Sequence, residues 1–217
     1  MKSVAESELM PDNRRIESFS DGVFAIVVTI MVLEIRIPDS LAFGYDRAAF
    51  NEFATYLGTY ALSFLVIVNL WTSHHYLLFT LRQPARTTLW YNSLLLFTVT
   101  LVPVATRFLG MHPSAPRAAA SYGFVAALCT AAFMLLRSHA ARTTHNDVHR
   151  GIHRRVIHRT WLFLAIYVAS IPLAFVNLWL AWACFVIVPP MLFLPIIRVP
   201  VDAEHAPRDH ALERSCP

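Results

Sequence analysis

Six apolar stretches constrain this chain more than any other feature of its sequence. They cover residues 19–37, 53–81, 89–109, 118–136, 160–176 and 178–197. A helix crosses a bilayer core of about 30 Å with about 20 apolar residues, and each stretch meets or approaches that length. The sequence therefore predicts an all-α integral membrane protein with six transmembrane helices.

Composition agrees with this prediction and excludes other classes of protein. Hydrophobic residues make up 56% of the chain and charged residues 15%, whereas a soluble domain carries about 25% charged residues. Residues 1–18 contain acids as well as bases and lack a small-residue cleavage site, which is not typical of a removable signal peptide. We expect a cytoplasmic segment over 1–18, a six-helix domain over 19–197 and a cytoplasmic tail over 198–217.

The positions of Lys and Arg predict the orientation, because positively charged loops stay in the cytoplasm. With the N-terminus inside, 14 of the 18 basic residues lie on the cytoplasmic side. The other four are Arg36, Arg47, Arg107 and Arg117. We therefore expect a multi-pass protein of the cell membrane with both termini in the cytoplasm, and a basic inner loop over 138–159.

Prolines and small residues predict how the later spans pack. Pro172, Asn177 and the pair at 189–190 favour a tight hairpin or broken helices between the fifth and sixth spans. Pro103 is expected to bend the third span. Small residues recur every four positions in the fourth span, which predicts close helix packing. These small residues are Ala119, Gly123, Ala127 and Ala131.

The first span combines an apolar stripe with a polar side. Residues follow one another by about 100° around a helix. One stripe therefore contains Phe19, Ile26, Ile30 and Leu33, with Val23 and Thr29 at its edges. Taken alone, such a stripe is typical of packing against lipid or other helices.

Ser20 and Asp21 lie on the other side of that helix. An intramembrane carboxylate is costly and needs a partner. Trp71, His74 and His75 share one side of the second span and could meet Ser20 and Asp21. Further candidate partners are Arg14, Arg15, Asn92 and Ser93. We interpret these residues as polar contacts between helices, with a proton relay or metal ligands as the alternative.

These residues also carry a resemblance to a known family. The run RIESFSD over residues 15–21 resembles the R-x-x-x-F-S-D signature of the transmembrane protein 175 family, the potassium channels of endosomes and lysosomes and their prokaryotic relatives. Its matching positions here are Arg15, Phe19, Ser20 and Asp21. The resemblance continues at Trp71, His74, His75, Asn92 and the run LVPVATR over residues 101–107.

The resemblance implies a homotetramer in which the first helix of each subunit lines a pore. The family's narrow hydrophobic layers correspond to Ile26, Ile30 and Leu33, with Thr29 as a polar neighbour, and this set coincides with the stripe found from helical geometry. No TVGYG-like potassium filter occurs in the sequence. An ion passing a ring of Ile26 side chains would shed part of its water without replacement ligands. Since K⁺ holds water less tightly than Na⁺, the expected function is a channel with a modest preference for K⁺ over Na⁺.

Two other classes of function remain as alternatives. A proton-coupled secondary transporter would use Asp21 with His74 and His75, yet we find no inverted repeat. An intramembrane enzyme or haem protein would use the two histidines, which point about 100° apart on a helix. Hydrolase and phosphate-loop motifs are absent from the sequence. We expect no enzyme activity, no cofactor and no metal beyond permeating K⁺. The expected partners are three further copies of the chain and the lipid bilayer. We expect no nucleic acid and no small-molecule partner other than ions.

Two polar features lie outside this scheme. His145, His149 and His153 recur every four residues in the expected inner loop. We interpret them as part of a solvated basic face beside anionic lipid, with a metal site as the alternative. The loop could also sense pH. Glu34 lies at the outer end of the first span, where a surface ion pair is simpler than a role in concentrating cations.

Overall fold

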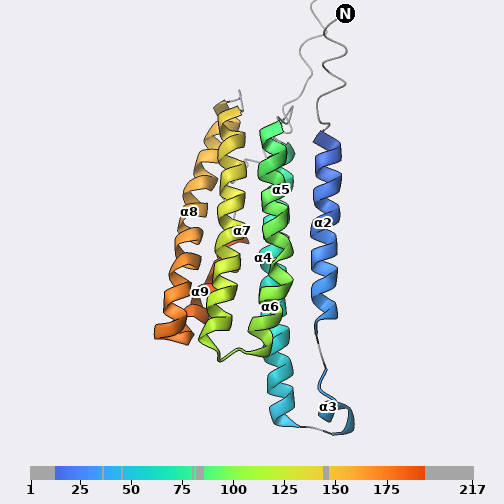
Figure 1. The fold of residues 1–217 in the computed structure, drawn as a ribbon. Coiled ribbons are helices and arrows are strands. Elements are labelled where there is room, and N and C mark those ends of the chain that lie inside the picture. The colour runs from blue at the N-terminus through green and yellow to red at the C-terminus, as the bar shows by residue number, and fades with distance from the viewer. Residues whose placement is uncertain are drawn as a thin grey trace, which may run out of the picture.

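The apolar stretches form long helices that run side by side (Figure 1). The computed structural model describes residues 13–35, 37–44, 46–79, 81, 86–143 and 147–193. The helices are α2 (Asn13–Leu33), α3 (Ser40–Phe43), α4 (Arg47–Phe79), α5 (Arg86–Thr100), α6 (Val102–Met111), α7 (Pro116–Thr143), α8 (Asp147–Val176) and α9 (Leu178–Phe193). The short α3 lies in the connection between α2 and α4.

Within the described part of the chain, five helical segments are long and apolar enough to cross a membrane. They are α2, α4, α5 with α6, α7, and the part of α8 from His153. The last helix, α9, is apolar and shorter, with 16 residues. The all-helical, multi-pass architecture predicted from the sequence is confirmed, while residues 194–197 of the expected sixth span lie outside the described residues.

The third span is interrupted close to the proline. The helix α5 ends at Thr100 and α6 begins at Val102. Pro103 has no N–H to continue the ladder. At the end of α5 the Thr100 hydroxyl donates to the Phe97 carbonyl at 2.7 Å, and Leu101 N–H donates to the Thr98 carbonyl at 3.2 Å. Side chains and local turns thus satisfy carbonyls at the break.

The basic segment over 138–159, expected as an inner loop between spans, is helical in most of its described residues. The helix α7 continues to Thr143 and α8 already begins at Asp147. Apolar length marks the part of a helix that crosses lipid, whereas the backbone hydrogen bonds that extend a helix are local and need no apolar side chains. Both helices therefore continue beyond their apolar cores.

The histidines of this segment do not form one solvated face. His153 is 1% exposed and belongs to the packed side of α8, whereas Arg154 and Arg155 beside it are exposed. The prediction that His153 belongs to a solvated basic face was wrong, because the helix turns this residue inward. His145 and the side chain of His149 lie outside the described residues.

Helix α7 contributes to both halves of the core. One cluster of buried side chains joins α2, α4, α5 and α7, and a second joins α6, α7, α8 and α9. The small residues of α7 lie in this packing: Ala119 and Gly123 are buried, and a Cβ built on Gly123 would collide with the Ser170 hydroxyl on α8. The close packing predicted from these small residues is confirmed.

Asn177 separates the last two helices. Its side-chain oxygen accepts the Trp179 backbone N–H at 3.0 Å, as a residue that caps the beginning of a helix does. The chain thus leaves α8 at Val176 and enters α9 at Leu178. The tight hairpin is confirmed, and both α8 and α9 continue through their internal prolines.

The two ends of the bundle differ in charge. The beginnings of α2, α5 and α8 and the ends of α4 and α7 lie at the same end of the bundle (Figure 1). Arginines gather at this end: Arg14, Arg15, Arg86, Arg142, Arg154 and Arg155. Among the described residues, the opposite end holds Arg47, Arg107 and Arg117. The fold therefore unites at one end most basic residues that are far apart in the sequence.

Candidate functional site

One face of helix α2 is buried in the bundle, and the opposite face is exposed in the single chain. The face in the bundle consists of Ile16, Ser20, Phe24, Val27 and Met31. The exposed large apolar side chains include Phe19, Ile26, Ile30 and Leu33. Ile26 is 58% exposed and Leu33 is 79% exposed, so lipid or other polypeptide must cover this face.

A buried hydrogen-bond chain fixes the inner face of α2 to α4 and α5. Ser20 donates to the Ile16 carbonyl at 2.8 Å and accepts from the Asn92 amide at 3.0 Å. The Asn92 oxygen lies 2.7 Å from His74 Nε2, so this nitrogen carries the hydrogen and donates. Ser20 and His74 are fully buried and Asn92 is 3% exposed. A continuous chain of buried hydrogen bonds thus joins α2, α5 and α4.

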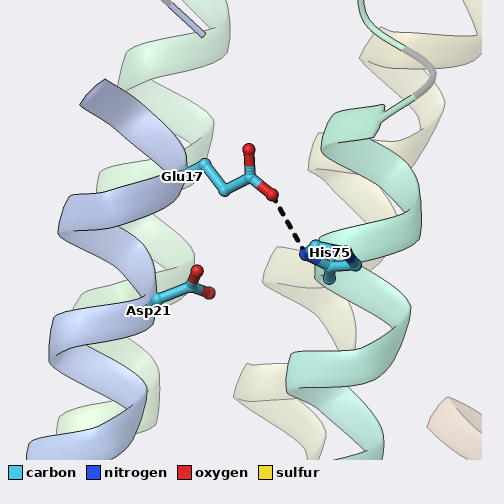
Figure 2. A group of neighbouring side chains, drawn as sticks. All are labelled: Glu17, Asp21 and His75. Atoms are coloured by element: carbon cyan, nitrogen blue, oxygen red, sulfur yellow. Dashed lines mark ion pairs between the residues drawn. The ribbon is translucent and has the colours of Figure 1, made fainter. Parts of the chain in front are cut away.

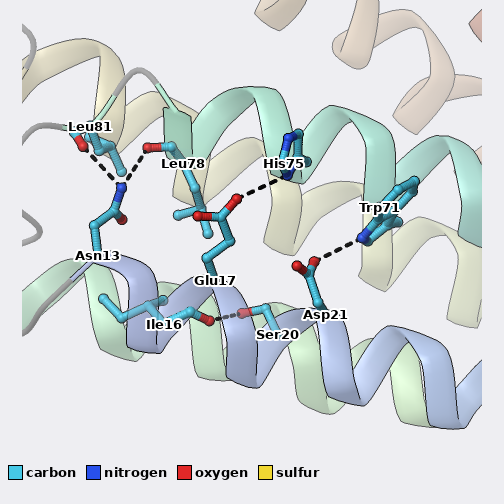
Figure 3. A network of polar contacts seen from close by, with 9 residues as sticks. All are labelled: Asn13, Ile16, Glu17, Ser20, Asp21, Trp71, His75, Leu78 and Leu81. Atoms are coloured by element: carbon cyan, nitrogen blue, oxygen red, sulfur yellow. Dashed lines mark hydrogen bonds and ion pairs between the residues drawn. The ribbon is translucent and has the colours of Figure 1, made fainter.

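A second, more exposed set of contacts joins α2 to α4 (Figure 3). Trp71 Nε1 donates to Asp21 Oδ1 at 2.8 Å, and His75 Nδ1 lies 3.0 Å from Glu17 Oε1. The polar partners of His74 and His75 thus lie on different helices, Asn92 on α5 and Glu17 on α2, because neighbouring residues point about 100° apart. The carboxylate of Asp21 has an indole as its partner in the part of the chain that the structure describes.

The beginning of α2 is also tied to the end of α4. Asn13 donates through its side-chain amide to the carbonyls of Leu78 and Leu81, at 3.0 and 3.2 Å (Figure 3). Leu78 is in the last turn of α4 and Leu81 follows the helix, and the Leu78 carbonyl also accepts the Leu81 backbone N–H at 3.0 Å, so the Asn13 amide adds a contact between α2 and the C-terminal end of α4. The whole first half of α2 is therefore anchored on one side.

The far half of α2 borders an apolar groove toward α6. The groove has a volume of about 430 Å³, and its walls include Ile26, Ile30, Thr100 and Val104. At its far end Glu34 pairs with Arg107 of α6 at 2.9 Å, which agrees with the surface ion pair favoured for Glu34. Arg36 lies outside the described residues.

Thr29 is the polar residue among the exposed apolar ones. Its hydroxyl donates to the backbone carbonyls of Ala25 and Ile26, at 3.0 and 2.9 Å. The hydrogen therefore points back to the helix, and the oxygen lone pairs remain directed away from it. An exposed acceptor is thus present one turn after Ile26.

Sequence reasoning did not single out two of the anchoring residues. Glu17 lies within the run RIESFSD without being one of its signature positions, and Asn13 precedes the apolar stretch. The spacing of Glu17 and Asp21, one helical turn apart, was the available indication that both face α4. Arg15, by contrast, is an exposed residue of α2.

The fold and these contacts define the class of protein: a multi-pass α-helical membrane protein whose first helix is anchored on one face and bare on the other. The family model for the endosomal/lysosomal potassium channel TMEM175 matches residues 15–103. This match contains the anchored helix, its partners on α4 and α5, and the break at Pro103.

Similar proteins extend the match to most of the chain. A potassium channel of Chryseobacterium sp. is 28% identical over 85% of this chain and 94% of its own length. A potassium channel of Chamaesiphon minutus is 30% identical over 85% of this chain and 95% of its own. The crystal structure of a lysosomal potassium-selective channel TMEM175 homolog from Chamaesiphon minutus superposes with a TM-score of 0.72 at 28% identity, covering 83% of this chain and 95% of that one. This chain belongs to the TMEM175 family.

Proposed function

We propose that four copies of this chain form a potassium channel whose pore is lined by α2. Two independent observations support this. The relatives that match over most of their length are named potassium channels. The apolar residues Ile26, Ile30 and Leu33 are exposed in the single chain, on a helix whose opposite face is fixed by hydrogen bonds.

That exposed stripe is the observation that carries the proposal. A single helix of this kind cannot enclose a path, and closed rings of identical subunits are the usual solution in oligomers. Four α2 helices around an axis would cover the stripes and leave a narrow apolar channel between them. The anchored face would then keep each helix at a fixed distance from the axis.

Selection in this channel would come from a constriction without ligands. Four Ile26 side chains meeting on the axis offer no oxygen to an ion, so the ion must give up water without compensation. A branched side chain has few rotamers with which to move aside. K⁺ gives up water more readily than Na⁺, so K⁺ is preferred, and the Thr29 oxygen provides an acceptor one turn further on. Apolar constrictions of this kind also gate by losing their water.

We propose that the chain lies in the cell membrane with the basic end of the bundle in the cytoplasm. The arginines at the beginnings of α2 and α8 lie on that side under this orientation. The positive-inside rule favours it over the reverse, because short loops rich in Lys and Arg stay inside. Glu34 and Arg107 then lie at the outer mouth.

Substitution at the constriction tests the mechanism. Ile26→Asn adds amide oxygens and holds water, so Na⁺ flux should rise relative to K⁺ flux in liposomes that contain the variant. Leu33→Asn is the matched control, because it places the same side chain nearer the end of α2, and it should change the flux ratio less. Mass measurement in detergent checks that both variants remain tetramers. A wild-type flux ratio in a conducting, tetrameric Ile26→Asn protein would show that selection occurs elsewhere.

A further inference from the structure

Three metal-binding side chains converge between α2 and α4 (Figure 2). Glu17 and Asp21 are one turn apart on α2, and His75 projects toward them from α4. One ligand atom from each lies within 4.8 Å of the other two. Two of these atoms, His75 Nδ1 and Glu17 Oε1, are already 3.0 Å apart.

We propose that this cluster is a binding site for a divalent transition-metal ion, of which Zn²⁺ is the probe. The donor set is one imidazole nitrogen and two carboxylates, all of which are ordinary zinc ligands. Ca²⁺ and Mg²⁺ prefer oxygen ligands alone, so the imidazole favours a transition metal. From the sequence, metal ligands at Asp21 and the histidines were only the alternative to polar contacts between helices, and Glu17 was not among the candidates.

The distances allow coordination with small movements of side chains. Zinc lies about 2.0–2.1 Å from nitrogen and oxygen ligands, so ligand atoms around a tetrahedral ion are about 3.3 Å apart. The pair of His75 and Glu17 is already near this spacing. Asp21 contributes an oxygen within 4.8 Å of the other two ligand atoms, and its carboxylate would turn about the Oδ1 held by Trp71 to close the remaining gap.

The surroundings orient the ligands and leave a path for the ion. Trp71 donates to Asp21 Oδ1, which fixes the carboxylate and leaves its second oxygen available. The side chains of His75 and Glu17 are 46% and 32% exposed, so the ion can enter and keep water at its remaining positions. A divalent cation also balances the charge of the two carboxylates.

A bound ion would join α2 to α4 where the polar contacts already anchor the helix. This site does not depend on conduction, because its ligands lie on the side of α2 that faces α4 and not on the exposed stripe. Its test is therefore a binding measurement, and it can succeed or fail independently of the channel.

The experiment is a titration of the purified full chain, freed of any histidine tag, with ZnCl₂ in a calorimeter. Glu17→Gln and His75→Gln each remove one ligand while nearly keeping the shape of the side chain or its hydrogen bonding. Each should weaken the Zn²⁺ affinity by about 10-fold or more, as loss of a metal ligand or its support does. The matched controls Glu52→Gln, at an exposed position of α4, and His112→Gln should bind as the wild type does.

A second measurement locates the ion. Co²⁺ quenches nearby tryptophan fluorescence, and Trp71 touches the proposed ligand Asp21. Quenching should saturate at the affinity measured by competition with Zn²⁺, and its largest component should disappear in Trp71→Phe. Equal Zn²⁺ affinities in the wild type, Glu17→Gln and His75→Gln would overturn the proposal, as would quenching that is unchanged in Trp71→Phe.

Discussion

Removal of Asn92 tests whether the buried contact between α2, α4 and α5 stabilises the fold. Asn92 is 3% exposed and bonds to His74 at 2.7 Å and to Ser20 at 3.0 Å. In Asn92→Ala, Ser20 keeps its bond to the Ile16 carbonyl, whereas the donor of His74 is left buried and unpaired. The stranded imidazole is therefore the main source of the expected destabilisation.

The expected loss of stability depends on whether the helices are surrounded by water or by lipid. A buried donor without a partner costs about 1–3 kcal/mol in soluble proteins. Hydrogen bonds between membrane helices contribute less, about 0.6 kcal/mol on average and about 1.7 kcal/mol at most, because the unfolded helices also find partners in the membrane. We expect a coupling free energy between Asn92 and His74 of about 0.6–1.7 kcal/mol, near the upper value because both side chains are buried.

The assay is a double-mutant cycle of Asn92→Ala and His74→Ala. The free energy of unfolding is measured by SDS titration in mixed micelles, with helix content followed by circular dichroism. The cycle cancels the loss of packing that each truncation causes alone. Asn51→Ala, at an exposed position of α4, is the control and should leave the free energy unchanged. A coupling below about 0.3 kcal/mol would refute the reasoning, because independent sites already agree to that level.

Two further substitutions test the anchoring and the packing. Asp21→Ala leaves Trp71 Nε1 without its acceptor and should reduce the fraction of assembled protein seen by light scattering after size exclusion; intact assembly with altered ion selectivity would instead put this carboxylate in the pore. Gly123→Leu places a large side chain where Ser170 packs, and it should lower the free energy of unfolding by about 1–3 kcal/mol or more in the same SDS titration. Gly58→Leu on α4 is its control, since a Cβ on Gly58 meets nothing within 4 Å, and equal losses in the two variants would contradict the packing argument.

Helix positions follow from the sequence better than helix ends. Apolar length located every long helix, because a bilayer imposes a minimum on it. It placed the beginning of the second span at 53, whereas α4 begins at Arg47, and it missed the helical continuation on both sides of 144–146. Helix propagation depends on local backbone bonds, and a hydropathy pattern does not report these.

The contacts of the site follow from the sequence only in part. Helical spacing brought Trp71, His74 and His75 to the side of α4 that meets α2. It did not predict that His74 hydrogen-bonds to Asn92 and that His75 pairs with Glu17, because these partners depend on where α5 packs. Glu17 lies near the beginning of a helix, where a charged residue is ordinarily taken for a surface residue, and its contact with His75 depends on how α4 packs beside α2.

Ion flux through the wild-type protein tests the central proposal most directly. The purified chain is reconstituted in liposomes, and flux is followed under a K⁺ gradient and then under an equal Na⁺ gradient, each without a proton gradient. A channel of the proposed kind conducts passively in both cases and conducts K⁺ faster. Flux that saturates and requires a proton gradient, or the absence of K⁺ flux from tetramers of intact mass, would contradict the proposal.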